Sequence, residues 1–303
     1  MGLLREIQTE IEARSLSRGG WSTGNRGSPA IETTCYALMA LGGDQGRAYR
    51  KAIDVLVRTQ NPDGSWSAFE GDDPEGCWTT ALAAITLRLA QSRTTPIEKA
   101  LRWLLNNNGR EGHWLWKWKF RTVDRAVQFN PDKYGWSWFP GTVSWVIPTA
   151  FSVIALRQLS PCCRTGQLTA RIQLGTEMLC DRACPQGGWN AGNGTVFGAA
   201  LTPHIDTTAI GLLALPRTAE PEVVQGLSWL RHACIECSSA YSLAWSVLAF
   251  SIHQDPGRDH CIEKLRTVLS SRASVFNIEA LSLAAIAINA VEENINPFQL
   301  DLK

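Results

Sequence analysis

The chain has 303 residues, of which 45% are hydrophobic, and a formal net charge of +1. This length and composition are sufficient for a large buried core, and we expect one compact domain over residues 1–303. The 29 basic and 28 acidic residues are mixed along the chain, so no strong field would attract DNA or RNA, and nucleic acid is excluded as an expected partner.

The N-terminus and the hydropathy pattern argue against membrane insertion. Arg5 and Glu6 interrupt the first apolar residues too early for a signal peptide, and no window reaches the ~18 uncharged apolar residues of a membrane span. Nine cysteines, an odd number, favour reduced and mostly buried thiols over a disulfide framework. These features predict a cytoplasmic protein without a transmembrane segment.

Six apolar segments rich in small residues repeat along the chain, which is typical of helices that other helices surround. They lie at residues 32–41, 78–87, 148–156, 206–215, 241–250 and 279–286. Amphipathic segments with charges along one side alternate with them, at residues 52–59, 97–106, 170–182, 222–233 and 263–272. Strand patterns are negligible.

Six alternations of an apolar and an amphipathic helix predict six helical hairpins. Apolar helices escape water without a second domain when they close into a ring inside a ring of amphipathic helices. We therefore predict an all-α fold, a six-hairpin α/α toroid with an inner apolar ring and an outer amphipathic ring. An open solenoid is the alternative, and it would need polar capping repeats that the sequence does not show.

Thirteen tryptophans are far more than a chain of this length ordinarily carries. A Gly-x-Trp ending recurs before the apolar segments, at Trp21, Trp66, Trp114 and Trp189. Glycine allows a tight turn after the outer helix, and the indole can stack over a neighbouring repeat. We expect these tryptophans mainly to hold the repeats together.

The spacing Gln-x-x-x-Gly-x-Trp resembles the QW motif of squalene-hopene and oxidosqualene cyclases. It is complete at Gln60, Gly64 and Trp66 and degenerate at Asn108, Gly112 and Trp114. The apolar repeats, over roughly residues 15–290, likewise resemble the prenyltransferase/squalene-cyclase repeat family. This resemblance is specific for the toroid and less so for the reaction, because one fold can carry unrelated functions.

One stretch, His204-Ile205-Asp206-Thr207-Thr208-Ala209, stands directly before an apolar helix. It resembles the Asp-x-Asp-Asp-Thr-Ala motif of class II terpene cyclases and its Asp-x-Asp-Thr-Thr variant, with His204 in place of the first Asp. The resemblance implies that Asp206 is the general acid that starts cyclisation of a prenyl or polyprenyl substrate, with His204 beside it to tune the carboxyl group. The alternative is an ordinary helix N-cap at Asp206, since Glu32 precedes two threonines in the same way.

Protonation of an alkene or epoxide needs a carboxylic acid that burial keeps neutral, and the carbocation that follows needs aromatic faces. Aromatic residues at or before the apolar helices are candidates for this lining. With Glu32, which also precedes an apolar helix, the predicted substrate-binding residues are Trp78, Trp136, Trp138, Phe139, Trp145, Phe197 and Tyr241. Four of them, Trp136, Trp138, Phe139 and Trp145, lie on the connection of about residues 109–147, which is longer than a hairpin loop needs and is a candidate lid.

The same connection interleaves basic residues with aromatic ones. Its basic residues are Lys117, Lys119, Arg121 and Arg125. They form either a clamp for the diphosphate of a prenyl substrate or a solvated strip on the lid. A diphosphate substrate would bring Mg²⁺, whereas an isoprenoid without one needs no metal, and we expect no redox cofactor.

Other enzymes with this fold need particular sets of metal ligands. Lanthionine-synthetase-like cyclases need an adjacent Cys-His pair, which does not occur here. Protein prenyltransferases need an Asp-x-Cys pair with a distant His on an apolar helix, and the Asp-x-Cys match, at Asp259 and Cys261, lies in a charged segment outside the apolar helices. Cys77, at the start of an apolar helix, is the one thiol that we expect the helix to stabilise as a thiolate.

Class II cyclases place the active site between two helical domains. The resemblance therefore implies either a self-contained cavity for a small isoprenoid or a partner chain, such as a second copy, that completes the pocket. The competing interpretation is a non-catalytic toroid that binds an isoprenoid or another protein.

Overall fold

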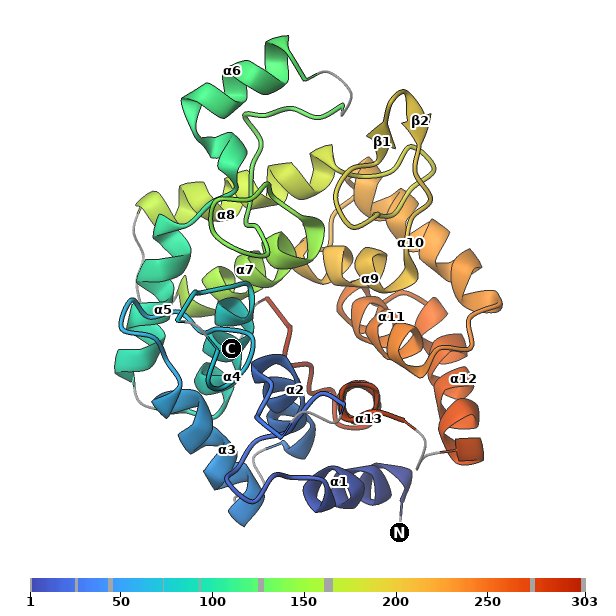
Figure 1. Cartoon of the computed structure of the whole chain (residues 1–303). Coiled ribbons are helices and arrows are strands. Elements are labelled where there is room, and N and C mark those ends of the chain that lie inside the picture. Colours follow the sequence, from blue (N-terminus) through green and yellow to red (C-terminus); the bar gives the residue numbers. More distant parts are fainter. Residues whose placement is uncertain are drawn as a thin grey trace. The chain divides into compact units, whose positions relative to one another are not determined.

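The computed structural model describes residues 2–24, 27–42, 46–72, 74–92, 94–124, 128–160, 166–272 and 276–300. All six predicted apolar segments and all five amphipathic ones form helices in it (Figure 1). Strand in these residues is limited to an antiparallel hairpin of β1 (Thr195–Val196) and β2 (Ala199–Ala200) and two isolated bridges. The prediction of an all-α chain with negligible strand is therefore confirmed.

The apolar helices are buried on nearly every side, as their composition predicts. They are α2 (Ile31–Leu41), α4 (Thr79–Leu89), α7 (Val146–Leu159), α9 (Ile205–Ala214), α11 (Ala240–His253) and α13 (Ile278–Glu292).

The amphipathic helices bury one face. They are α1 (Leu3–Ala13), α3 (Arg47–Arg58), α5 (Thr94–Asn106), α8 (Gly166–Asp181), α10 (Pro221–Ile235) and α12 (Gly257–Arg272). The sequence analysis did not predict α1, in which Ile7 and Ile11 are buried. Within the described ranges, every helix is too short or too polar to cross a bilayer.

The contacts of the chain divide it into two compact units. The first comprises the residues up to Ala100 and Cys237–Pro297; in it the last apolar helix, α13, packs on the first, α2, with α11 against α13 and α4 against α2. The second comprises Leu101–Glu236 and the residues from Phe298, and in it α7 packs on α9 and α8. A single domain over residues 1–303 stays a prediction.

A buried tryptophan connects each of four amphipathic helices to the apolar helix that follows it. The backbone N–H of this tryptophan donates to a threonine Oγ1 on the apolar helix, and the indole N–H donates to a carbonyl of the preceding helix, at 2.7–3.1 Å. We call this pair of bonds the tryptophan tie. It links Trp21 with Thr34 and Ile11, Trp66 with Thr80 and Leu56, Trp136 with Thr149 and Leu104, and Trp189 with Thr208 and Leu179.

The Gln and Gly of the complete QW motif shape the turn that precedes the tie. Gly64 has φ +97°, and a Cβ there would lie 2.5 Å from the carbonyl oxygen of Lys99 on α5, so no other residue fits. The Gln60 amide donates to the carbonyls of Gly64, at 2.9 Å, and Pro96, at 2.8 Å, and so fastens the turn to the first turns of α5.

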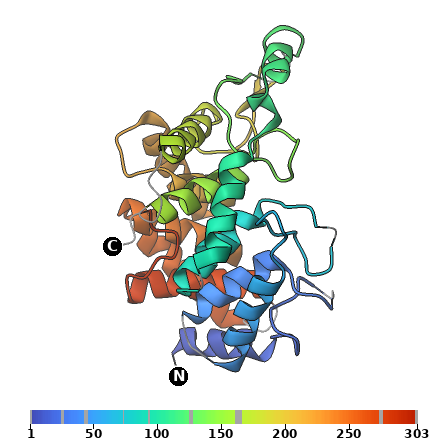
Figure 2. The ribbon, with the colours of Figure 1, turned by 90° about the vertical axis from the view of Figure 1, so that its left-hand side faces the viewer.

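The degenerate QW match at Trp114 is wrong. Its side chain is 71% exposed, and the tie of this repeat belongs to Trp136. The reason is an insertion between α5 and the turn: a short 3₁₀ helix (Arg110–Gly112) and α6 (Trp114–Thr122) precede Trp136. Figure 2 shows α6 standing away from the other helices of its own unit.

Trp66→Phe is expected to lower the free energy of unfolding by about 2 kcal/mol, because the buried Leu56 carbonyl loses its donor and a small cavity remains. Urea denaturation measures this loss. Trp118→Phe, at a position 57% exposed, is the matched control and should change stability by less than about 0.5 kcal/mol. Equal losses in both variants would contradict a structural role for the tie.

Candidate active site

Two apolar helices, one in each unit, begin with an acid followed by two threonines. The acids are Glu32 on α2 and Asp206 on α9. In both helices the second threonine, Thr34 or Thr208, accepts the backbone bond of the tryptophan tie. The tryptophan tie therefore explains the second threonine of the motif in both repeats. It does not explain the acid, which remains the candidate for a chemical role.

Asp206 is half-buried in the first turn of α9. Its Oδ1 accepts a hydrogen bond from the backbone N–H of Thr207 at 2.9 Å. The N-cap residue of α9 is His204, two residues before the N-cap position predicted at Asp206. The exposed ring of His204 has its Nε2 3.4 Å from Nδ2 of Asn190. Among the described residues, its contacts do not include the predicted bond to Asp206.

Glu32 is a half-buried acid at the start of α2, in the first unit. Burial, and after it the charge of Glu279, raise the pKa of Glu32 to about 7, against a hydrogen bond with Tyr36 that lowers it. A carboxyl group with this pKa keeps its proton in a large fraction of molecules near neutral pH.

Glu279 holds the same position on α13 that Glu32 holds on α2, the second residue of the helix. Its Oε1 accepts the hydroxyls of Thr33, on α2, and Thr23, each at 2.7 Å. The sequence analysis did not single out Glu279, although it stands at the start of the last apolar repeat. Because α13 packs on α2, the charge of Glu279 reaches Glu32 and contributes to its raised pKa.

Aromatic side chains lie on the Glu32 side of this pair of acids. Tyr36, one turn after Glu32, is buried, and burial raises its pKa well above the usual value, so it stays a neutral hydroxyl. Its ring meets the buried indole of Trp245 edge-on, with centroids 5.7 Å apart, and Tyr241 meets the same indole at 6.2 Å. Of the predicted binding residues, Tyr241 and Glu32 are thus brought together.

Trp78 is the half-buried N-cap residue of α4, and Cys77 precedes it. Burial raises the pKa of the Cys77 thiol, whose Sγ lies 3.1 Å from Oγ1 of Thr79. The prediction of a helix-stabilised thiolate is wrong, because desolvation outweighs the field of the helix terminus and keeps the thiol protonated.

The other predicted binding residues lie in the second unit. Trp136 is buried in its tryptophan tie, and the guanidinium of Arg171 lies 3.8 Å from its ring centroid. Packing therefore accounts for the burial of Trp136, and its contact with a substrate stays a prediction. Phe139 and Phe197 are 46% and 82% exposed, which does not suit the wall of a dry pocket. Trp138 and Trp145 are half-buried.

The basic strip of the long connection lies on α6. Lys117 and Arg121 both pair with Asp132, and Lys119 stacks on Trp116, 4.6 Å from the ring centroid. Arg125 lies outside the described residues. These partners favour a solvated strip over a diphosphate clamp. In the part of the chain that the structure describes, no three His, Cys, Asp or Glu side chains are placed to hold a metal.

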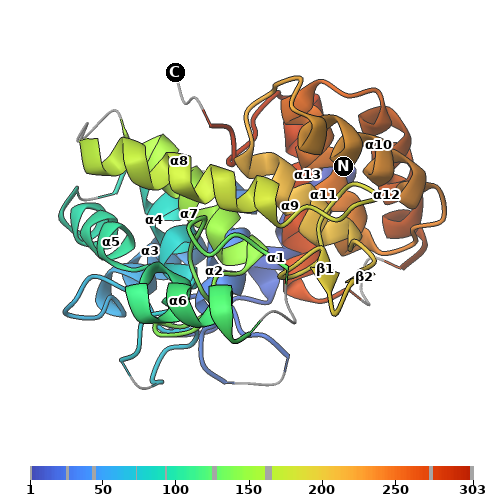
Figure 3. The ribbon, with the colours of Figure 1, turned by 90° about the horizontal axis from the view of Figure 1, so that it is seen from above.

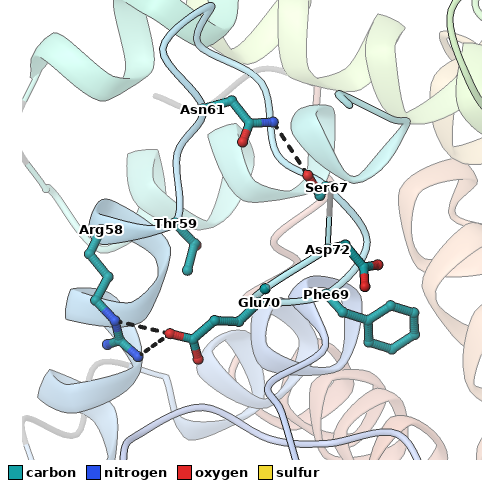
Figure 4. A pocket seen from close by; sticks show the side chains of 8 residues that line it. Arg58, Thr59, Asn61, Ser67, Phe69, Glu70 and Asp72 are labelled. Atoms are coloured by element: carbon teal, nitrogen blue, oxygen red, sulfur yellow. Dashed lines mark hydrogen bonds and ion pairs between the residues drawn. The ribbon is translucent and has the colours of Figure 1, made fainter. Parts of the chain in front are cut away.

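A polar pocket of about 320 Å³, which the sequence did not predict, lies in the first unit on the loop between α3 and α4 (Figure 4). Glu70 crosses it to accept two bonds from the Arg58 guanidinium, at 2.7 and 3.2 Å, through one carboxylate oxygen. The lining residues are Arg58, Thr59, Asn61, Ser67, Phe69, Glu70, Gly71 and Asp72. Acids, amide and guanidinium make the pocket suitable for a ligand rich in hydroxyl groups.

The raised pKa of Glu32 makes the stability of the protein depend on pH. The folded state binds a proton there between the ordinary pKa of 4.5 and about 7, so this contribution is complete below pH 4.5 and is lost as the pH rises through 7. Glu32→Gln, neutral at every pH, is therefore expected to exceed the wild type in stability above pH 7 by up to about 3 kcal/mol. Urea denaturation between pH 4.5 and 8 measures the difference.

The matched control for this experiment is Glu293→Gln, at an exposed position after the opposite end of α13. Its stability should follow the wild type at every pH. A Glu32→Gln curve that runs parallel to the wild type would show that Glu32 titrates as an ordinary surface acid.

No family profile matches the chain. A curated relative, the squalene–hopene cyclase of Bradyrhizobium diazoefficiens, is 27% identical over 130 residues, which cover 42% of this chain and 18% of that protein. The chain therefore matches less than a fifth of the length of this relative.

Solved structures share the fold over nearly the whole chain. An α-amylase from Clostridium perfringens has a TM-score of 0.63 at 10% identity and covers 94% of this chain and 97% of its own. The type II terpene cyclase MstE from Scytonema has a TM-score of 0.55 at 13% identity, and the match covers 95% of this chain and 98% of MstE. The predicted fold class, all-α of the α/α-toroid type, is confirmed by this similarity. By sequence over part of its length and by fold over most of it, the chain is squalene-cyclase-like, similar to the prenyltransferase/squalene-cyclase repeat family.

Proposed function

We propose that this chain starts the cyclisation of an isoprenoid by protonating it and that Glu32 donates the proton. The observation that carries the proposal is the place of the Glu32 carboxyl group, in the first turn of an apolar helix and beside Tyr36, where burial and the charge of Glu279 raise its pKa. The terpene-cyclase fold and the squalene–hopene cyclase match support the same class of reaction.

The chemistry needs one acid and no redox step. The Glu32 proton passes to a terminal alkene carbon of the substrate, the π electrons form the new C–H bond, and a tertiary carbocation and a Glu32 carboxylate remain. Attack by a second alkene closes a ring, transfer of a proton from the last cation to water restores a double bond, and proton uptake from solvent returns Glu32 to its acid form. Aromatic rings such as those of Tyr36 and Tyr241 suit the stabilisation of positive charge in such a sequence.

Two acids are candidates for the proton donor. Asp206 is the candidate that the sequence motif indicates, and Glu32 is the candidate that its burial and the nearby Glu279 indicate. If Asp206 were the donor, the tyrosine and carboxylate neighbours of Glu32 would serve packing alone. The two assignments make opposite predictions for two conservative substitutions.

Glu32→Gln should lower formation of cyclic products from farnesyl diphosphate, geranylgeranyl diphosphate or squalene by at least about 100-fold, the usual effect of losing a general acid. Asp206→Asn is the matched variant and should keep most of the activity. Product analysis by gas chromatography with mass spectrometry measures both. The reverse pattern would assign the proton to Asp206, and no cyclic product from any of the three substrates would sink the proposed reaction.

A second candidate is binding or cleavage of a carbohydrate, which the polar pocket between α3 and α4 favours. Phe69 offers an aromatic face there, and Glu70 and Asp72 offer carboxylates to sugar hydroxyls. The α-amylase with a similar fold is consistent with this candidate. Calorimetric titration with maltotriose, repeated with Asp72→Asn, tests it: saturable binding lost in the variant supports the carbohydrate function, and no heat of binding rejects it.

A further inference from the structure

Backbone pairing joins the polar pocket to the start of α2. The loop that lines the pocket runs antiparallel to the segment before Glu32, with a bridge between Ala30 and Phe69. The backbone N–H of Ile31 donates to a carbonyl of the loop at 2.9 Å, and that of Glu70 donates to a carbonyl of the segment at 3.0 Å. Figures 1 and 3 show α2, α3 and α4 next to one another in the first unit. The wall of the pocket is therefore fixed to the helix that carries Glu32.

The pairing sets an upper limit on the distance between the pocket and the acid. Ala30 and Phe69 face each other between the two bonds, an arrangement in which the α carbons lie about 4.5 Å apart. Glu32 follows Ala30 by two residues, which adds at most about 7 Å of backbone. The α carbons of Glu32 and Phe69 are thus no more than about 12 Å apart. A prenyl chain held at one end in the polar pocket can reach Glu32.

A buried thiol lies close to both the acid and the pocket. Burial is the largest cause that raises the pKa of Cys77, and the charges of Glu32 and of Asp72, a residue of the pocket, raise it further. Each carboxyl group is therefore near enough to the same sulfur for its charge to act on it. This agrees with the backbone pairing, which puts Glu32 and the pocket in one region at the starts of α2 and α4.

The lining of the pocket suits an uncharged group with several hydroxyls. Its charged residues are one guanidinium, Arg58, and two carboxylates, Glu70 and Asp72. Glu70 already neutralises Arg58, through the two bonds that Figure 4 shows. A diphosphate would meet the charge of Asp72 with no excess of positive charge among the lining residues to offset it. Hydroxyl groups, in contrast, can donate to the carboxylate oxygens, and a sugar ring can stack on Phe69.

We propose that the polar pocket holds the head group of the substrate and that this substrate is an isoprenoid with an uncharged, hydroxyl-rich head, such as a sugar or another polyol. The inference rests on the proposed function, protonation by Glu32, and adds the substrate class to it. The prenyl chain extends from the pocket to the start of α2. Binding of the head then fixes which double bond lies at the acid, so that contacts remote from the reacting carbon contribute to the rate.

Three farnesyl compounds that share a chain and differ in the head test the inference. They are farnesyl β-glucoside, farnesyl methyl ether and farnesyl diphosphate. The wild type should cyclise the glucoside with a kcat/KM at least about tenfold above that of the ether, which lacks the hydroxyls, and above that of the diphosphate, which the carboxylates repel. Liquid chromatography with mass spectrometry measures the products. An ether or a diphosphate cyclised as well as the glucoside would overturn the inference.

Asp72→Lys should reverse the preference, because it replaces a carboxylate of the lining with a cation. The kcat/KM for the glucoside should fall by at least about tenfold, and that for the diphosphate should rise. The matched control is Glu75→Gln, at an exposed acid of the same loop that does not line the pocket. It should keep the wild-type order of the three compounds, and circular dichroism should show that both variants are folded. An unchanged order in Asp72→Lys would count against the pocket.

Binding to Glu32→Gln, which lacks the proton donor, separates this inference from the proposed reaction. Calorimetric titration should show that this variant binds the glucoside at least about tenfold more tightly than the ether, and that adding Asp72→Lys removes the difference. Equal affinities would overturn the inference even if the wild type makes cyclic products. Preferential binding of the glucoside by a chain whose wild type yields no cyclic product would uphold the head-group pocket and reject the proposed reaction instead.

Discussion

Two hydrogen bonds of a buried tryptophan determine how the outer and inner helices of four repeats are joined. The indole N–H donates to a carbonyl of the helix before it, and the backbone N–H donates to a threonine of the helix after it. An outer helix and an inner helix contact each other through apolar surfaces, which have little directional preference. The tryptophan tie adds two directional bonds in buried surroundings, where an unmade bond is costly. Trp66 shows the whole device, because Gly64 and Gln60 shape the turn that delivers the indole.

The tie also explains why the start of an inner helix is suited to a reactive acid. The threonine that accepts the tie stands two residues after the acid position, so the same bond that packs the repeat fixes the location of Glu32 or Asp206. What differs is the neighbourhood. Glu32 lies in the same unit as Glu279, Tyr36 and Tyr241, and burial together with the nearby carboxylate raises its pKa.

The insertion between α5 and Trp136 is an addition to this repeated plan. It leaves the tie of its repeat intact, because Trp136 still bonds Leu104 and Thr149 across the inserted residues. The repeat therefore does not need α6 for its own packing. A helix that the fold does not need, with indoles directed outward and cations beside them, is most simply understood as a surface for binding something else.

The sequence by itself determined the helices and the residue type at each start of an inner helix. Apolar periodicity and small residues are local properties, so α2, α4, α7, α9, α11 and α13 could all be predicted. The tertiary structure decided which of these residues share surroundings. The pKa of Glu32 depends on Glu279, which is 247 positions away in the chain and reaches it only through the packing of α13 on α2. The exposure of Trp114 and the burial of Trp136 were likewise beyond the local pattern, because Gly-x-Trp spacing records a turn and an indole but not which indole the neighbouring helices cover.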